Sequence, residues 1–155
     1  MSATPATKQL DQLGLSYELH EYAYDPKAKN IGQHAATALG IDPARLFKCL
    51  MFGSAKAKAF ALVPTSAEMN LKSAAKALKE KKIDLLDPRQ AEKITGYVIG
   101  GISPIGQKLR AKAFLDQSAF DHETILVNGG KRGLQIEIAP HDLIAACNAQ
   151  VLLLT

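Results

Sequence analysis

The segment GYVIGGISPIGQK, at positions 96–108, holds four glycines and one proline in thirteen residues. Glycine adopts positive φ angles and lets its backbone approach another group closely, whereas proline fixes its own φ. We therefore expect a shaped loop whose N–H groups can point at an anion, or at an oxygen that becomes anionic. The centre of this loop is formed by Gly100, Gly101, Ile102 and Ser103. A purely structural tight turn is the alternative.

Several known signatures are absent from this segment and from the chain around it. No G-x-G-x-x-G follows a predicted strand, and no G-x-x-x-x-G-K-[ST] occurs, so the common nucleotide-binding loops are excluded. Ser103 does not lie in a G-x-S-x-G elbow and has no evident His–Asp partner in the sequence. A serine hydrolase triad is therefore not expected.

Length and composition are those of one globular domain. The 155 residues, 47% hydrophobic and 22% charged, suffice for a single core, and we assign residues 1–155 to one domain. No apolar run is long enough to cross a bilayer, and the first residues lack a signal-peptide pattern, so a cytoplasmic location is expected. Cys49 and Cys147 are far apart in sequence, which predicts reduced thiols.

The spacing of the histidines and the distribution of charge indicate which kinds of ligand the chain could bind. The four histidines show no metal-ligand spacing, so a metal is not expected. No other cofactor is expected either. A net charge of +4 permits an anionic partner without requiring one. Two basic groups are suggestive because they flank glycine turns: residues 108–112 follow the loop, and Lys131–Arg132 lie in a second turn. A third basic group, within residues 72–82, is typical of a solvated face.

Alternating and helical patterns predict short elements of both kinds. Helix caps are expected at Thr4, Asn30, Asn70 and Asp87, with glycines ending the helices at 14, 40 and 96. Strands are expected at 16–22, 46–52, 58–63, 83–86, 113–115, 124–127, 134–138 and 151–154. This order predicts a mixed α/β (α+β) domain in which a central mixed sheet is flanked by helices.

Lys48 is the most unusual residue, because it interrupts an apolar strand between Phe47 and Cys49. A buried unpaired ammonium is costly, so this lysine must reach water, pair with an acid or bind an anion. A lysine reaching solvent from a strand edge is one interpretation, and a clamp for a phosphate or carbonyl is the other. Tyr22 and Tyr24 are candidates for stacking or hydroxyl donation, although half-buried structural tyrosines are common.

Three stretches resemble one protein family closely. They are FKCL at 47–50, GYVIGGISPIGQK at 96–108 and GGKRGL at 129–134. They are similar to the motifs of the YbaK family, free-standing bacterial relatives of the editing domain inserted in prolyl-tRNA synthetases. The resemblance covers essentially the whole chain, and within the family it is best to the deacylases of Cys-tRNA(Pro). It implies a mixed α/β domain that hydrolyses the ester joining a wrong amino acid to tRNA, without a metal.

The resemblance also implies site residues. Lys48 matches the family's lysine, which with Gly100 and Gly101 would form the catalytic group. The substrate-binding residues implied are Tyr22, Ile31, Cys49, Ile102, Ser103, Asn128, Gly129, Lys131 and Arg132. Three of these depart from the usual pattern: Cys49 replaces threonine, Ile31 replaces phenylalanine and Asn128 replaces serine. These departures bear on amino-acid preference more than on the class of reaction.

The implied chemistry needs no protein nucleophile. A cysteinyl ester brings a thiol with a pKa of about 8.5, and an oriented intramolecular attack reaches effective molarities on the order of 10⁵–10⁸ M. Amide donors of the loop could stabilise the oxyanion. Two alternatives stay open: an Ala- or Ser-tRNA deacylase that uses an activated water, and a non-catalytic module that binds tRNA or a nucleotide. The expected partners are mischarged tRNA and, as the family suggests, prolyl-tRNA synthetase.

Overall fold

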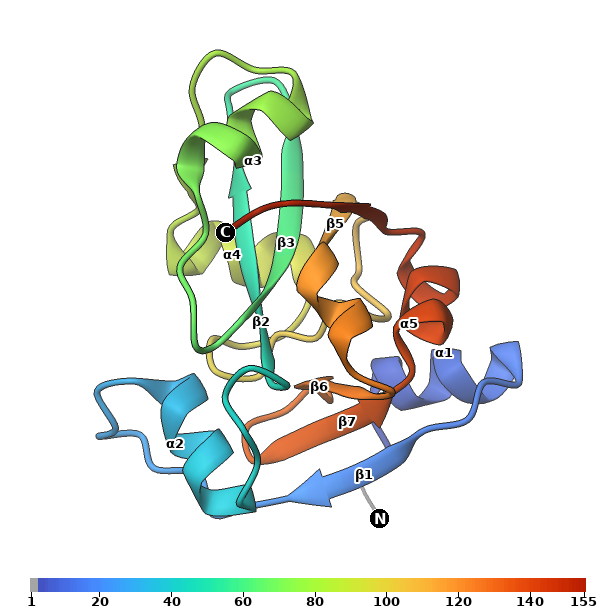
Figure 1. Cartoon of the computed structure of the whole chain (residues 1–155). Coiled ribbons are helices and arrows are strands. Elements are labelled where there is room, and N and C mark those ends of the chain that lie inside the picture. Colours follow the sequence, from blue (N-terminus) through green and yellow to red (C-terminus); the bar gives the residue numbers. More distant parts are fainter. Residues whose placement is uncertain (1–2) are drawn as a thin grey trace.

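A computed structural model describes residues 3–155 (Figure 1). The helices are α1 (Pro5–Leu13), α2 (Ile31–Leu39), α3 (Leu71–Leu78), α4 (Pro88–Thr95) and α5 (Pro140–Cys147), with a 3-10 turn, η1 (Gln117–Asp121). The strands are β1 (Glu18–Glu21), β2 (Phe47–Gly53), β3 (Lys58–Pro64), β4 (Asp84–Leu85), β5 (Lys112–Asp116), β6 (Ile125–Asn128), β7 (Leu134–Ile138) and β8 (Gln150–Leu152). None of these helices is long and apolar enough to cross a lipid bilayer.

The helix boundaries follow the side chains that were predicted to cap them. The side chains of Thr4, Asn30, Asn70 and Asp87 each accept a hydrogen bond from the backbone N–H three residues further on. Gly14, Gly40 and Gly96 end α1, α2 and α4 in the left-handed conformation, which a residue without Cβ adopts at little cost. The cap predictions are therefore confirmed.

The expected mixed α/β domain is confirmed, but its strands form two sheets. One has the order β4-β2-β3-β5-β8; β2 and β3 make an antiparallel hairpin, and β3-β5 and β5-β8 are parallel pairs. The other is antiparallel, with the order β1-β7-β6. A single parallel bridge between Leu46 and Leu126 links the sheets. The segment before β2 pairs with β6 only at this one bridge, so the hydrogen-bonded ladder stops there and the two sheets separate.

Alternating side chains of the larger sheet enter two cores. Phe47, Phe60 and Leu62 face the core that contains α1, α4, α5 and the smaller sheet. Phe52, Ala61 and Val63 face the core covered by α3. Because β3 is buried on both faces, it reads as an unbroken apolar run, as central strands do. The smaller sheet lies against this double-sided layer and presents its β6–β7 turn beside the glycine loop.

Thr4 joins the start of α1 to the β6–β7 turn. Its side-chain oxygen accepts from the Thr7 N–H at 3.2 Å and its hydroxyl donates to the Gly129 carbonyl at 2.6 Å. The Thr7 hydroxyl in turn accepts from the Thr4 N–H at 2.9 Å, which completes a capping box. One buried hydroxyl thus stabilises the helix and positions the turn.

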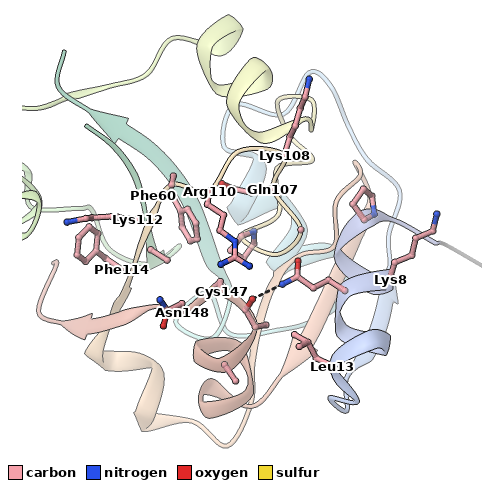
Figure 2. Close-up of a pocket in the computed structure, with 18 of the residues that line it drawn as sticks. Lys8, Leu13, Phe60, Gln107, Lys108, Arg110, Lys112, Phe114, Cys147 and Asn148 are labelled. Carbon is pink, nitrogen blue, oxygen red and sulfur yellow. Dashed lines mark hydrogen bonds between the residues drawn. The ribbon is translucent and has the colours of Figure 1, made fainter. Parts of the chain in front are cut away.

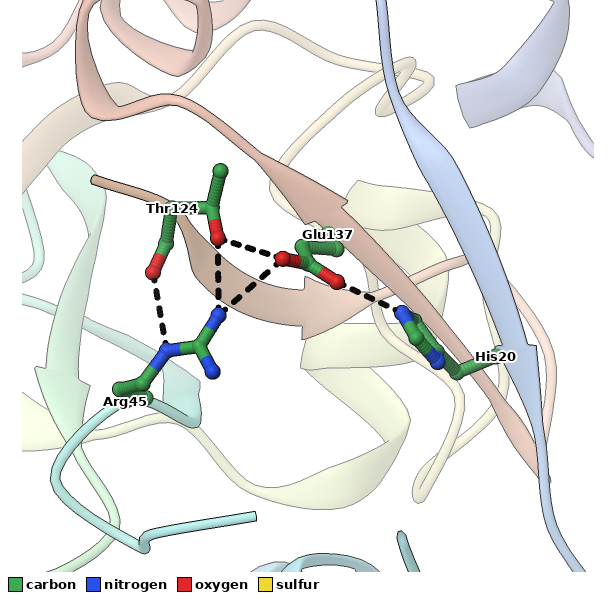
Figure 3. A network of polar contacts seen from close by, with 4 residues as sticks. All are labelled: His20, Arg45, Thr124 and Glu137. Carbon is green, nitrogen blue, oxygen red and sulfur yellow. Dashed lines mark hydrogen bonds and ion pairs between the residues drawn. The ribbon is translucent and has the colours of Figure 1, made fainter. Parts of the chain in front are cut away.

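A polar network around Glu137 ties the smaller sheet to the segment before β2 (Figure 3). The Glu137 carboxylate accepts from Thr124 Oγ1 at 2.5 Å, lies 2.8 Å from His20 Nε2 and pairs with Arg45 Nη2 at 3.1 Å. Arg45 also donates to the Thr124 carbonyl at 3.1 Å. The Thr124 hydrogen bond, followed by His20 and Arg45, lowers the pKa of Glu137 below its usual value of 4.5.

Glu137→Gln should lower the free energy of unfolding at pH 7 by about 1–2 kcal/mol, because it removes the charge that Arg45 and Thr124 contact. A carboxylate whose pKa is lowered in the folded state adds stability above its usual pKa, and that stability is lost as the pH falls through the folded-state pKa. The difference between wild type and variant should therefore shrink in acid. Urea unfolding between pH 3 and 7 measures it, and Glu123→Gln, at an exposed position, is the charge-matched control. A difference that is constant with pH would contradict this account.

Thr4→Ala should destabilise the fold by about 1–2 kcal/mol, the cost of losing a helix N-cap together with the bond to Gly129. Thr4→Ser keeps the hydroxyl and should recover most of this loss. Chemical denaturation of the three proteins gives the comparison. Equal destabilisation by both substitutions would show that the methyl group, not the hydroxyl, holds the turn.

Candidate functional site

The glycine loop begins where α4 ends and is held at both ends. Gly96 donates to the Glu92 carbonyl at 2.9 Å, and the Ile99 N–H donates to the Glu92 carboxylate at 2.9 Å. The hydroxyl of Tyr97 donates across the loop to the Ile105 carbonyl at 2.6 Å. Burial raises the pKa of Tyr97, so this phenol stays a donor. The loop therefore has a fixed shape, as its glycines and proline predicted.

The amide groups of the loop differ in what they can still bind. The Gly101 N–H is already used, because it donates to the Val98 carbonyl at 2.8 Å. The N–H groups of Gly100, Ile102 and Ser103 have no acceptor among residues 3–155. Ser103 is fully buried, and a buried N–H without a partner is rare and costly. Gly100 and Ile102 are half-buried, and an oxygen atom of a ligand would satisfy their two donors, whereas Ser103 is closed to solvent.

The loop packs directly on the turn between β6 and β7. Asn128 Nδ2 donates to the Gly100 carbonyl at 3.1 Å, and Arg132 Nε donates to the Ile99 carbonyl at 2.9 Å. A Cβ on Gly101 would lie 2.9 Å from backbone atoms of Lys131 and Arg132, and Cβ atoms in proteins essentially never lie that close to another heavy atom. Glycine is thus required here because two backbones meet. The two glycine-rich motifs of the sequence form one structure.

The turn itself is ordered by short bonds, while its cations remain exposed. Gly130 N–H donates to Asn128 Oδ1 at 2.7 Å, and Gly129 N–H donates to the Leu134 carbonyl at 2.8 Å. Lys131 and Arg132 are exposed. The Arg132 guanidinium lies 5.3 Å from the centre of the Tyr24 ring, a cation–π distance. Tyr24, a candidate weighed beside Tyr22, therefore borders the loop and the turn.

Tyr22 and Ile31 lie on the adjoining side, where β1 ends and α2 begins. The Tyr22 N–H donates to the Gly133 carbonyl at 3.0 Å, which ties it to the same turn. Its ring meets the His34 ring edge-on at 6.0 Å, and burial raises the pKa of its phenol. Ile31 is the first residue of α2 and is half-buried.

Lys48 and its neighbour Cys49 face opposite sides of β2. Lys48 shares a face with Leu46, whose side chain packs with α2 in the cluster that Tyr22 borders. Lys48 is half-buried, and no acid or carbonyl within residues 3–155 accepts from its amine. Cys49 packs instead into the core on the other face, where burial raises the pKa of its thiol far above the usual range.

Ser103 and Gln107 fix the second half of the loop. Ser103 Oγ accepts from the Ile105 N–H at 3.2 Å, and the Ser103 carbonyl accepts from Gln107 Nε2 at 3.0 Å. Gln107 Nε2 also lies 3.7 Å from Met51 Sδ and 4.0 Å from Cys49 Sγ. Ser103, predicted to bind substrate, is fully buried and bonds within its own loop, so it shapes the loop.

One group of side chains in the described part of the chain could approach a cation. Ligand atoms of Glu18, His20 and Glu137 lie within 4.8 Å of one another. The Arg45 guanidinium contacts the same Glu137 carboxylate, so the negative charge there is already compensated. These residues belong to the network of Figure 3 and not to the glycine loop.

The structure therefore brings together most residues predicted from the sequence. Gly100, Gly101, Asn128, Gly129, Lys131 and Arg132 meet where the loop and turn touch, and Tyr22 joins them through Gly133. Lys48 and Ile31 come from the adjoining β2 and α2. Sequence patterns missed that the Gly101 amide is consumed within the loop, because a hydrogen bond over three residues leaves no mark on residue type.

Several known proteins resemble this chain in sequence or in fold. A protein of Enterococcus faecalis named "Putative Cys-tRNA(Pro)/Cys-tRNA(Cys) deacylase EbsC" is 35% identical over 148 residues, 95% of this chain and 90% of that protein. A crystal structure described as "a putative trans-editing enzyme for prolyl tRNA synthetase" has a TM-score of 0.81 at 24% identity, covering 99% of both chains. A hypothetical protein, APE2540, has a TM-score of 0.84 at 19% identity, covering 97% of this chain and 99% of its own.

The two solved structures share the fold described above. The sequence model of a protein family, the aminoacyl-tRNA editing domain, matches residues 25–146. This range runs from the loop after β1 to α5 and includes both glycine motifs. With this match and the relative at 35% identity, the chain belongs to the family of aminoacyl-tRNA editing domains.

Proposed function

We propose that this protein hydrolyses the aminoacyl ester of mischarged Cys-tRNA(Pro), and also of Cys-tRNA(Cys). The observation that carries the proposal is the 35% identity, over 95% of the chain, to a protein named for these two substrates. The glycine loop adds a physical reason, since it offers unpaired amides to the ester carbonyl. Because its proposed substrate is a tRNA, we place the protein in the cytoplasm as part of this proposal.

The loop amides and Lys48 have separate roles in this proposal. Attack on the ester places negative charge on the carbonyl oxygen, and the N–H groups of the half-buried Gly100 and Ile102 would bind that oxyanion. Each such donor is worth about 2.7–4 kcal/mol in known oxyanion holes. The Lys48 amine, which no acid neutralises among residues 3–155, would bind a phosphate of the terminal adenosine or the substrate carbonyl.

The substrate itself would supply the nucleophile. The cysteinyl sulfur attacks its own carbonyl carbon, the bond from that carbon to the ribose oxygen breaks, and the thiol proton passes to the ribose oxygen. Water then opens the resulting thiolactone to free cysteine. Roughly a few per cent of a thiol is thiolate at neutral pH, and almost none of a serine hydroxyl is ionised. Selection for cysteine would thus depend on the reactivity of its thiol. The size of a pocket cannot discriminate strongly between side chains as similar as those of Cys, Ser and Ala.

The protein's own thiols do not offer an alternative nucleophile. Burial raises the pKa of Cys147 to about 12 and that of Cys49 further. Both thiols therefore stay protonated at neutral pH, and Cys49 is packed in the core. This supports attack by the substrate thiol or by water.

Prolyl-tRNA synthetase is the partner that we propose. One protein of the same fold is described as a trans-editing enzyme for that synthetase. A chain of 155 residues has little surface with which to recognise a whole tRNA, and a synthetase would present the tRNA that it has just charged.

Wild type should clear Cys-tRNA(Pro) at least about a hundredfold faster than Ala-tRNA(Pro) or Ser-tRNA, because only the thiol gains the intramolecular route. Release of labelled amino acid, followed over many turnovers, measures this ratio. Similar rates for the cysteinyl and seryl esters would favour an activated water. Stoichiometric binding without turnover would favour a non-catalytic module.

Lys48→Ala should lower kcat/KM for Cys-tRNA(Pro) by about 10²–10³, the usual cost of removing one charge-stabilising group. Lys48→Arg keeps the charge and should retain part of the activity. Lys72→Ala, at an exposed position of α3, is the matched control. Equal rates for Lys48→Ala and wild type would remove the amine from the mechanism.

Gly101→Ala should abolish most activity while the protein still folds. The new methyl group would meet the Lys131–Arg132 backbone at 2.9 Å, so the loop and turn must separate and the donors of Gly100 and Ile102 move. Deacylation kinetics measure the effect, and thermal melting checks the fold. A variant with wild-type kcat would show that this contact does not position the donors.

A further inference from the structure

A concave region lies beside the second half of the glycine loop, away from the contact with the β6–β7 turn. It is a cavity of about 990 Å³ bounded by α1, residues 104–113, Phe60 of β3 and the end of α5 (Figure 2). Gln9 of α1 donates to the Ala146 carbonyl at 2.8 Å and so joins the two helices along one side. None of the catalytic or substrate-binding residues implied by the resemblance lines this cavity, but the basic group at residues 108–112, noted in the sequence, does.

The charges around this cavity are all positive. Lys8, Lys108, Arg110 and Lys112 line it, and its lining includes no Asp or Glu. All four side chains are exposed. Within residues 3–155 both ion pairs are made by Glu137, so none of these four cations has an acidic partner. Like charges gathered without acids repel one another, and an anion would relieve that repulsion.

The spacing of the cations favours a chain of anions over a single one. Figure 2 shows Arg110 in the middle of the view, with Lys112 to the left, Lys8 to the right and Lys108 above, so the three lysines surround the arginine at the rim. A lone phosphate could contact only one or two of these groups, whereas a polynucleotide backbone presents phosphates in series. The lining between these cations includes amide side chains, for example those of Gln9, Gln12 and Asn148. Lysine, arginine and amide side chains are the usual phosphate and sugar contacts in nucleic-acid complexes.

The cavity and the candidate site share one segment of chain. Residues Gly100 and Gly101 face the β6–β7 turn, and Gly106, Gln107 and Lys108 line the cavity. An RNA whose 3′ end is bound by the first half of the loop therefore has the cavity within reach of its preceding nucleotides. We propose that the cavity binds the phosphate backbone of the tRNA acceptor arm, an inference that rests on the proposed function.

The test removes three of these charges together in Lys8→Ala/Arg110→Ala/Lys112→Ala. Lys72→Ala/Lys81→Ala/Lys82→Ala loses the same charge from exposed positions outside the cavity and is the control. Fluorescence anisotropy with uncharged tRNA(Pro) gives Kd between 50 and 300 mM salt. We expect binding by the cavity variant to be about 10- to 100-fold weaker near 0.1 M salt. Its slope of log K against log salt should be flatter by about 2–3, and the control should stay near wild type.

Two results would overturn the inference. Equal weakening by the cavity variant and the control would show that only overall charge matters. Unchanged tRNA binding, with loss of binding to poly-L-glutamate, would assign the cavity to an acidic protein. Thermal melting of both variants confirms that they fold.

A second measurement separates this inference from the proposed function. Deacylation is followed with full-length Cys-tRNA(Pro) and with 3′-cysteinyl-adenosine, which has no acceptor arm. The cavity variant should show a raised KM for the tRNA and unchanged kinetics for the small ester. If wild type hydrolyses neither substrate, the proposed function fails, while weaker tRNA binding by the cavity variant alone would still support the cavity as an RNA surface.

Discussion

The contact between two backbones at Gly101 is the constraint on which the candidate site depends. Residues 131 and 132 approach so closely that a single added carbon would lie 2.9 Å from three of their atoms. The contact is reinforced by Asn128 and Arg132, which donate to the Gly100 and Ile99 carbonyls. It fixes the loop from outside, and the internal bond from Gly101 to Val98 fixes it from within. Unpaired amides can face a ligand only because the rest of the loop is immobilised in this way.

The two sheets explain how that contact is held. The larger sheet buries both faces of β3 and supplies a rigid layer, against which the smaller sheet packs through Ile125, Val127 and Ile136. The network at Glu137 and the hydroxyl of Thr4 then fix the smaller sheet at its two ends. The β6–β7 turn is therefore positioned by three independent sets of contacts before any ligand is present.

Much of this could be predicted from residue types. Asn, Thr and Asp before helical patterns, and Gly after them, located the helices, because capping depends on side chains that the sequence shows directly. Lys48 was conspicuous because a charge inside an apolar run has few explanations. The separation of the strands into two sheets could not be predicted, since pairing at Leu46 and Leu126 depends on tertiary packing. The cavity could not be predicted either, because Lys8 of α1 and Lys112 of β5, which both line it, are more than a hundred positions apart in the sequence.

The bond from Thr4 to Gly129 also has a consequence for how the protein can be joined to others. Residue 4 is fastened beside the β6–β7 turn, close to the glycine loop. Leu154 is buried instead, and its backbone binds Asn70 and Asp116. A purification tag or a fused domain at the carboxyl end would therefore begin beside the core that α3 covers, whereas one at the amino end would lead to a residue that holds the β6–β7 turn.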